Sequence, residues 1–279
     1  DYPAVSPILA LQKILDSIYE KNRLPAEQGE IKAATFDPKG ENILTGGRDG
    51  SIQVWNLAGE KLAQIQAHEG GPLGSINSVS FSPDGKYFAS ASEDGTAGLW
   101  TSATGEQQAI LAGHSGNIER IRFSPDSETV VTTGSNGEVF LWNQSGDRLG
   151  EFVGHEDKVL AVSFSPDGQT LVTAGNDGSI RVWNIVSRRV QTSWSGLGGE
   201  VVYDVNFSPD GQHLVSAGAD QIARVWNLDG QEDVRLEGHR LLVTRSNFAP
   251  DGQVIATASD DGTVKLWNLN GEEIETFQG

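Results

Sequence analysis

One short phrase recurs six times along this chain and constrains its fold more than any other feature. Each copy begins with Phe and has Pro two positions later, and the Phe residues stand 41 to 45 positions apart. They are Phe36, Phe81, Phe123, Phe164, Phe207 and Phe248. Six tryptophans keep the same step: Trp55, Trp100, Trp142, Trp183, Trp226 and Trp267. Self-similarity at a fixed period of this length is the signature of a repeat architecture.

Each copy reads as four short strands. In the second copy the strands are expected over 76–81, 87–92, 97–100 and 107–111. The first two are joined by a Pro-Asp-Gly turn, and the next two by a tight Asp-Gly hairpin. Turns every 8–12 residues exclude helical repeats. Four strands per copy, repeated around a closed ring, predict an all-β fold of the β-propeller class.

The direct count is six four-stranded repeats, each with its own fourth strand. In the last copy this strand covers 273–277, and the chain ends at Gly279 within what looks like another repeating phrase. A six-bladed ring is therefore expected for this chain, with room for a seventh blade in the intact protein. The predicted propeller occupies 28–279, and 1–27 form an N-terminal helix or linker.

These residues resemble the WD-repeat (tryptophan–aspartate) family of propellers over about 24–279. The resemblance implies a buried hydrogen-bond network in each blade, made by a His before the first strand, a second-strand Ser or Thr, a hairpin Asp and the third-strand Trp. The matching residues are His68, Asp94, Trp100, His114, Trp142, His155, Asp177, Trp183, Asp220, Trp226, His239, Asp261 and Trp267.

The repeats depart from the family pattern at several positions. Asn136 replaces the hairpin Asp in the third repeat. Glu27 stands at the His position of the first repeat, and Leu197-Gly198 at that of the fifth, so we expect looser networks there. A buried Asp is unfavourable unless it is paired and hydrogen-bonded. The His and Asp of each repeat are therefore interpreted as structural rather than as an acid–base pair.

The N-terminal segment breaks the β pattern. Ser6 is a plausible N-cap, and Ile8, Leu11, Leu15 and Ile18 follow at helical spacing, which predicts an amphipathic helix over 6–24. The helix either packs on the propeller or links it to an upstream domain. The run resembles the junction in bacterial, especially cyanobacterial, signal-transducing NTPases with C-terminal WD-repeat sensors. With no initiator Met and no signal segment, the chain is expected to be an excised part of a cytoplasmic protein.

Composition and motifs exclude several classes of function. Thirty-eight acidic residues against 20 basic ones give a formal net charge of -18, which opposes binding to nucleic acid. No apolar run is long enough to span a membrane, and the absence of cysteine excludes disulfides and thiolate chemistry. There is no phosphate-binding glycine–lysine loop, and His213 has no evident ligand partner nearby. We expect no catalytic residues, no metal and no cofactor, and hence no enzyme.

Recognition is then expected at the propeller rim where the first strands begin. The family resemblance places the residues four and six before each turn Phe, and the residue before the hairpin Asp, on this rim. Repeats one to three put mostly polar groups there. Repeats four to six put four apolar side chains side by side, and these four define the rim crescent: Leu160, Val201, Tyr203 and Leu242. Lys158, Asn176, Thr244 and Asp260 surround them. An apolar patch with an aromatic side chain and a charged border is typical of a protein interface.

Two functions follow from these expectations. The first is a non-catalytic protein-interaction scaffold that serves as the sensor or regulatory module of a larger signalling protein, with the N-terminal helix reporting to an upstream NTPase domain. The alternative is an acidic, chaperone-like binder of basic proteins, for which the charge of -18 is the argument. Strong salt dependence of binding would favour the alternative.

Overall fold

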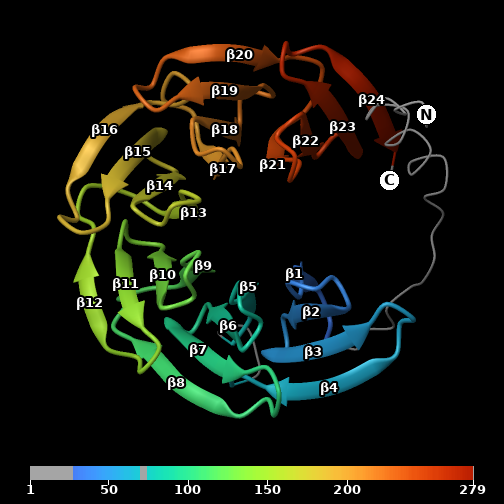
Figure 1. Cartoon of the computed structure of the whole chain (residues 1–279), viewed down its shortest axis with the longest axis vertical. Helices are drawn as coiled ribbons and strands as arrows, with labels where there is room; N and C mark the ends of the chain where they lie inside the picture. Colours follow the sequence, from blue (N-terminus) through green and yellow to red (C-terminus); the bar gives the residue numbers. More distant parts are fainter. Residues whose placement is uncertain (1–27, 70–73, 279) are drawn as a thin grey trace, which may run out of the picture.

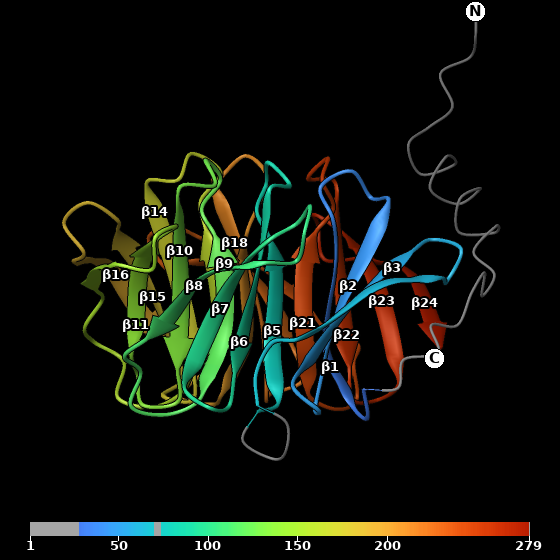
Figure 2. The same cartoon turned by 90° about the horizontal axis from the view of Figure 1, so that it is seen from below.

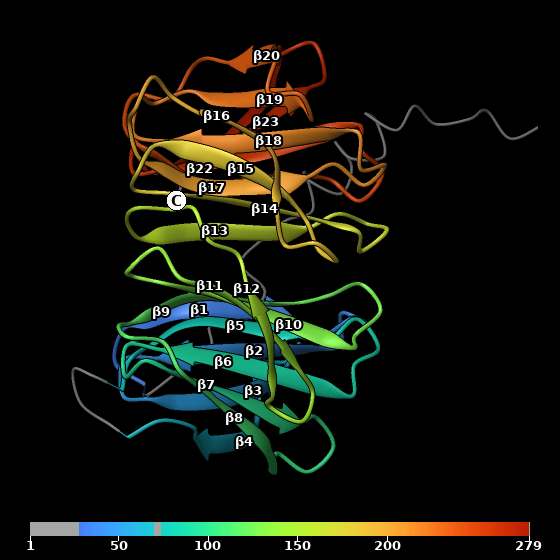
Figure 3. The ribbon, with the colours of Figure 1, turned by 90° about the vertical axis from the view of Figure 1, so that its left-hand side faces the viewer.

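Six four-stranded antiparallel sheets stand around a common centre in the computed structural model, which describes residues 28–69 and 74–278. Figure 1 shows the first strand of each sheet at the centre and the fourth at the periphery. Viewed edge-on, the sheets form a disc whose strands cross from one face to the other (Figures 2 and 3). The predicted N-terminal helix over 6–24 lies outside the described residues.

The strands have similar lengths in every blade. Blade 1 contains β1 (Ile31–Phe36), β2 (Asn42–Gly47), β3 (Ser51–Asn56) and β4 (Lys61–Gln66). Blade 2 contains β5 (Ile76–Phe81), β6 (Tyr87–Ser92), β7 (Thr96–Thr101) and β8 (Gln107–Ala112). Blade 3 contains β9 (Ile118–Phe123), β10 (Thr129–Gly134), β11 (Val139–Asn143) and β12 (Arg148–Glu151). Blade 4 contains β13 (Val159–Phe164), β14 (Thr170–Gly175), β15 (Ser179–Asn184) and β16 (Val190–Ser195). Blade 5 contains β17 (Val202–Phe207), β18 (His213–Gly218), β19 (Ala223–Asn227) and β20 (Glu232–Leu236). Blade 6 contains β21 (Val243–Phe248), β22 (Val254–Ser259), β23 (Thr263–Asn268) and β24 (Glu273–Gln278). The predicted strands of the second repeat are confirmed to within one residue at each end.

The repeated turn joins the first two strands of a blade through local hydrogen bonds. In blade 4 the Ser165 hydroxyl donates to the Asp167 carboxylate at 2.6 Å and accepts from the Thr170 amide at 2.9 Å. Gly168 has φ +68°, a conformation that glycine adopts without steric penalty. In blade 3 Ser127 takes this position with φ 67°, and its hydroxyl accepts a hydrogen bond from the Asp84 amide of the neighbouring blade at 3.1 Å.

Apolar clusters join each blade to the next. In the cluster between blades 5 and 6, Phe248, Ile255 and Trp267 of blade 6 pack against an apolar face of blade 5 that includes Ala217 and Val225. Equivalent clusters join blades 1 and 2, 2 and 3, 3 and 4, and 4 and 5. Blades 2 to 6 thus each present their turn Phe and their Trp to the preceding blade, and the core of the protein lies between the sheets.

The ring is open between blade 6 and blade 1, so the expectation of a closed ring is wrong for the residues described. The inner strands pack in succession from β1 to β21, but within 28–69 and 74–278 neither inner-strand packing nor an apolar cluster joins β21 to β1. Figure 1 shows the opening between β21–β24 and β1–β4. The repeat count was correct, but closure depends on the angle between neighbouring blades, which the count does not contain.

Burial confirms that blade 1 lacks a neighbour on the side of the opening. Ile31 is 39% exposed, whereas its counterparts in the other five blades are all 0% exposed: Ile76, Ile118, Val159, Val202 and Val243. Phe36 is 60% exposed, whereas the other turn phenylalanines are buried or partly buried.

On the side of blade 6 that faces the opening, an apolar side chain is also exposed. Val264 is 40% exposed, whereas its counterparts are all 0% exposed: Ile52, Ala97, Val139, Ile180 and Ala223. The opening is therefore bordered by the two halves of one more apolar interface of the kind that joins the other blades.

Two phenylalanines at the same repeat position give a matched test of this packing. Phe123→Ala should destabilise the protein by about 3–5 kcal/mol, because it removes a side chain from the interface between blades 2 and 3. Phe36→Ala should change stability by no more than about 0.5 kcal/mol, as is usual for exposed positions. Urea unfolding followed by tryptophan fluorescence measures both. A loss at Phe36 as large as that at Phe123 would contradict an open ring.

Candidate functional site

The His-containing networks are continuous chains of hydrogen bonds, seen most clearly in blade 4. His155 Nδ1 lies 2.8 Å from Asp177 Oδ2, and its Nε2 lies 2.7 Å from Thr173 Oγ1. The Trp183 indole N–H donates to the same hydroxyl at 2.8 Å. Because that hydroxyl accepts from the indole, its own proton is directed to His155 Nε2, which leaves the imidazole proton on Nδ1, facing the carboxylate. Every polar group of the set has a partner.

Blades 2 and 6 repeat this arrangement, and blade 3 modifies it. His68 lies 2.9 Å from Asp94, and His239 lies 3.1 Å from Asp261. In blade 3 Asn136 does not reach the imidazole, and His114 Nδ1 instead lies 3.1 Å from Glu138 Oε2. Sequence reasoning missed Glu138. Its signal was a longer acidic side chain two residues after the replaced Asp, in the same hairpin.

Blades 1 and 5 lack the His and differ from each other. In blade 1 the fully buried Gln28 donates from Nε2 to the Ser51 carbonyl at 2.6 Å, and its Oε1 accepts from Thr45 Oγ1 at 2.7 Å. Trp55 donates to the same Thr45 hydroxyl at 3.0 Å, so this network is complete rather than loose. Glu27, the residue expected there, lies outside the described residues.

In blade 5 the indole of Trp226 keeps its bond to Ser216 at 2.8 Å, but no imidazole is present. Asp220 forms an ion pair with Arg224 instead, and Leu197 is buried beside the blade. An ion pair and an apolar side chain thus take the place of the His–Asp contact.

Burial and hydrogen bonding shift the pKa values of several groups in these networks. Burial alone would raise the pKa of the Asp177 carboxyl, but hydrogen bonds from His155 and Ser179 lower it well below its usual value. Burial lowers the pKa of His68 and of His114, although the neighbouring carboxylates oppose that shift. The His155 side chain is also 0% exposed. Imidazoles paired to carboxylates away from solvent suit a structural role better than proton transfer to a substrate.

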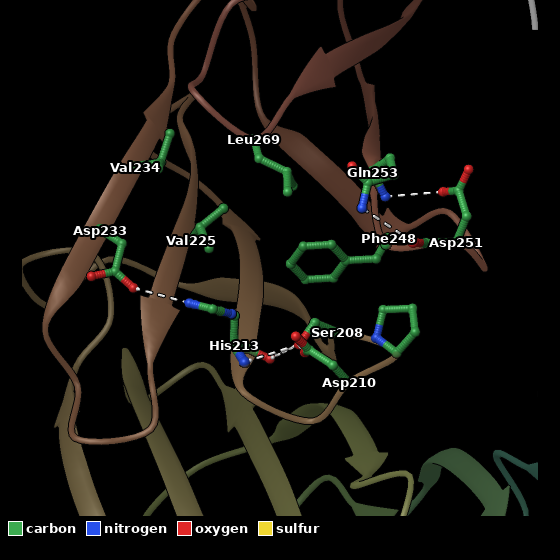
Figure 4. Close-up of a pocket in the computed structure, with 12 residues that line it drawn as sticks. Ser208, Asp210, His213, Val225, Asp233, Val234, Phe248, Asp251, Gln253 and Leu269 are labelled. Atoms are coloured by element: carbon green, nitrogen blue, oxygen red, sulfur yellow. Dashed lines mark hydrogen bonds and ion pairs between the residues drawn. The ribbon is translucent and has the colours of Figure 1, made fainter. Parts of the chain in front are cut away.

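A groove of about 590 Å³ lies between blades 5 and 6 on the outer side of their repeated turns. Figure 4 shows His213 directed toward Asp233, and their nearest atoms are 3.8 Å apart, a partner that sequence reasoning missed. A similar groove of about 470 Å³, lined by Phe81 and Asp84, lies between blades 1 and 2. The groove is thus a product of blade packing that recurs with the repeat. Among residues 28–69 and 74–278, no cluster of three His or acidic groups is arranged to hold a metal ion.

The rim crescent spans three successive blades. Leu160 lies in β13, Tyr203 in β17, and Val201 and Leu242 directly precede β17 and β21; all four are partly exposed. Backbone hydrogen bonds hold two of the expected bordering residues at the rim. The Asp260 amide donates to the Leu242 carbonyl at 3.0 Å, and the Asn176 amide to the Lys158 carbonyl at 2.9 Å. Thr244 lies in β21, two residues beyond Leu242, and is partly exposed.

The polar part of the rim is held by ion pairs between blades. Lys32 of blade 1 lies 2.6 Å from Glu93 of blade 2, and Lys158 of blade 4 lies 3.0 Å from Glu119 of blade 3. Sequence reasoning missed Leu241, which is 50% exposed and adjoins the rim crescent. Its signal was the Leu-Leu pair before β21, in a loop that is otherwise polar.

The sequence of this chain matches the model of a known protein family. The family model described as the first β-propeller of IFT122 matches residues 30–279. The chain belongs to this WD-repeat β-propeller family.

Two cyanobacterial proteins share shorter stretches with the propeller. The WD repeat-containing protein slr0143 of Synechocystis sp. is 36% identical over 64 residues, which are 23% of this chain and 5% of that protein. The WD repeat-containing protein slr1409 of the same organism is 46% identical over 39 residues, 14% of this chain and 12% of that protein. The matches thus cover only a small part of each relative. Within 28–69 and 74–278 the propeller has no helix that could cross a membrane.

The buried networks predict a loss of stability on mild acidification. The pKa of His114 is lowered in the folded protein, so below about pH 6.5 the unfolded chain binds this proton more tightly and the free energy of unfolding falls. Burial alone would raise the pKa of Glu138, but hydrogen bonds from Ser115 and the contact with His114 hold it below its usual value, and this contribution is lost in more acidic solution. Urea unfolding between pH 7.5 and 5 measures the effect.

His114→Gln isolates the contribution of the imidazole, because Gln28 fills the same place in blade 1. This variant should show a shallower fall in the free energy of unfolding between pH 7 and 5 than the parent protein. His213→Gln is the control, since the His213 side chain is 45% exposed and lies outside the buried networks. Identical pH profiles for the parent and His114→Gln would show that the buried imidazole is not the titrating group.

Proposed function

We propose that this propeller is a non-catalytic protein-interaction scaffold that binds a protein partner through the rim crescent. The supporting observation is the partial exposure of Leu160, Val201, Tyr203 and Leu242 on three successive blades, at the ends of rigid inner strands. Such strands present side chains in a fixed geometry, which limits the entropy lost when a partner binds.

The composition of the rim crescent fits the anatomy of a protein interface. One tyrosine among aliphatic side chains provides an anchor of the kind that carries much of the binding energy. Lys158 and Asp260 lie at its border, where charged groups affect association rate and specificity more than affinity. In blades 1 and 2 the rim presents charged side chains that pair with each other, Lys32 with Glu93, instead of an apolar patch.

We further propose that the propeller is the sensor or regulatory part of a larger cytoplasmic signalling protein. The support is the small share of its relatives that the matched stretches cover, 5% and 12%. In this proposal residues 1–27 connect the propeller to an upstream NTPase domain. Occupancy of the rim by a partner would then be communicated through that connection.

The formal net charge of -18 supports a second candidate function, an acidic binder of basic proteins. The two functions differ in what determines affinity. Binding through the rim crescent should depend on apolar side chains and little on salt. Binding through diffuse negative charge should weaken steeply as the ionic strength rises.

The test uses peptides selected from a phage-displayed library against the whole propeller, with affinities measured by biolayer interferometry. The double variant Tyr203→Ala/Leu242→Ala should weaken binding of the selected peptides at least tenfold, because it removes the aromatic anchor and an aliphatic neighbour. The matched control is Glu30→Ala/Arg48→Ala, whose side chains are 62% and 61% exposed at the predicted polar part of the rim.

The outcomes separate the two functions. Loss of affinity in the crescent variant alone, with unchanged circular dichroism, supports recognition by the rim crescent. Equal affinity in both variants would overturn that site. Selection of only basic peptides, with affinity lost between 50 and 300 mM salt and unaffected by the crescent variant, would support the acidic binder.

A further inference from the structure

A cluster of arginines lies at the centre of the ring and is not used by the rim or by the buried networks. Arg120 and Arg122 of β9 and Arg245 of β21 line one cavity of about 260 Å³. Because β9 belongs to blade 3 and β21 to blade 6, this cavity lies in the central channel, where the inner strands face one another (Figure 1).

The repeat itself does not require arginine at these positions. The residue before the turn Phe is Arg122 in blade 3, but Thr35, Ser80 and Ser163 in blades 1, 2 and 4. The residue three before the Phe is Arg120 in blade 3 and Arg245 in blade 6, whereas blades 1, 2 and 4 have Ala33, Ser78 and Ala161. Blades 1, 2 and 4 thus have only small neutral side chains at these positions, whereas blade 5 has Asp204 and Asn206. The arginines are therefore a local addition to the common plan.

The three guanidinium groups have no carboxylate ion pair within the described part of the chain. Each donates a hydrogen bond to a backbone carbonyl: Arg120 to Glu119 at 2.9 Å, Arg122 to Ile121 at 3.1 Å and Arg245 to Thr244 at 2.7 Å. This distinguishes them from Arg224 and Arg235, which pair with acidic residues.

One carboxylate, Asp204 of β17, lines the same cavity, and it is already engaged. Its Oδ2 accepts hydrogen bonds from the Ser246 amide at 3.0 Å and from the Asn206 side chain at 3.2 Å. Three positive charges against one negative charge leave an excess of two positive charges in the cavity. The cavity therefore carries positive charge, although the chain as a whole has a formal net charge of -18.

The electrostatic environment is unfavourable for the arginines alone. Burial, together with the neighbouring Arg245 and Arg122, lowers the pKa of Arg120 to about 10. Burial also lowers the pKa of Arg122. Like charges crowded in a partly desolvated site are relieved when an anion of opposite charge binds between them.

An unpaired polar group adjoins the same cavity. Ser246 lines the cavity and is 2% exposed, yet its hydroxyl has no hydrogen-bond partner among the described residues. A buried hydroxyl without a partner is rare in folded proteins, and it requires an explanation such as a bound water or ligand.

We propose that the central channel binds a small divalent oxyanion, a phosphate group or a close equivalent, between Arg120, Arg122 and Arg245. Guanidinium groups suit this ligand because their planar N–H pairs match two oxygens of one phosphate. Asp204 accepts a hydrogen bond from the Ser246 amide and so keeps the backbone of β21 in place. The cavity volume of about 260 Å³ suits a phosphate or pyrophosphate rather than a bulky organic ligand.

Isothermal titration calorimetry with inorganic phosphate and with pyrophosphate, on the whole chain at low ionic strength, tests this site. One site per chain is expected. Arg122→Gln and Arg245→Gln should each weaken binding at least tenfold, because each removes a charge and a pair of donors. Arg48→Gln is the control, since it makes the same change at an exposed position outside the channel.

A folding defect is separated from a binding defect by two further measurements. Arg245 is exposed toward the channel, so Arg245→Gln should keep the circular dichroism spectrum of the parent even if Arg122→Gln does not. Phosphate should raise the melting temperature of the parent and of Arg48→Gln, but not that of Arg245→Gln. The absence of measurable heat at millimolar phosphate, or equal weakening by Arg48→Gln and Arg245→Gln, would overturn the proposal.

Discussion

The apolar contact between successive blades is the interaction on which the rest of this structure depends. A four-stranded sheet has two faces, and a single sheet in water buries neither of them. Here each of blades 2 to 6 gives its turn Phe, an apolar second-strand residue and its Trp to the preceding blade. The opening between blades 6 and 1 follows from the same rule, because Ile31, Phe36 and Val264 remain exposed where no such contact is made.

The buried polar networks act within this apolar frame. In each blade the indole N–H of the Trp donates to a hydroxyl of the second strand. In four blades an imidazole connects that hydroxyl to a carboxylate in the next hairpin. Satisfied networks of this kind specify the position of the loops more than they add net stability. Substitution by Gln28 in blade 1 and by Glu138 in blade 3 shows that the geometry, and not one residue type, is what the fold needs.

The strands could be predicted from the sequence because local turn residues determine where each strand begins and ends. The Pro-Asp-Gly turn and the Asp-Gly hairpin each position a strand within a few residues, so the ends of β5 to β8 were predictable to within one residue. Ring closure was not predictable, since it depends on small rotations that accumulate over all blades. The residues of the rim crescent were inferred from rim positions that the family resemblance implies, and as a binding site they stay a prediction. Arg120, Arg122 and Arg245, by contrast, are brought together only by the ring.

Hydrogen exchange of the whole chain, followed by mass spectrometry, tests most directly whether each blade depends on its neighbours. Blades 2 to 5 have neighbours on both sides, whereas blades 1 and 6 have one each, so local opening should require less free energy at the two ends of the array. Amides of β2 and β22 should therefore exchange at least tenfold faster than those of β6, β10, β14 and β18. Uniform protection across all six blades would contradict the account, because it would require the terminal blades to be supported on both sides.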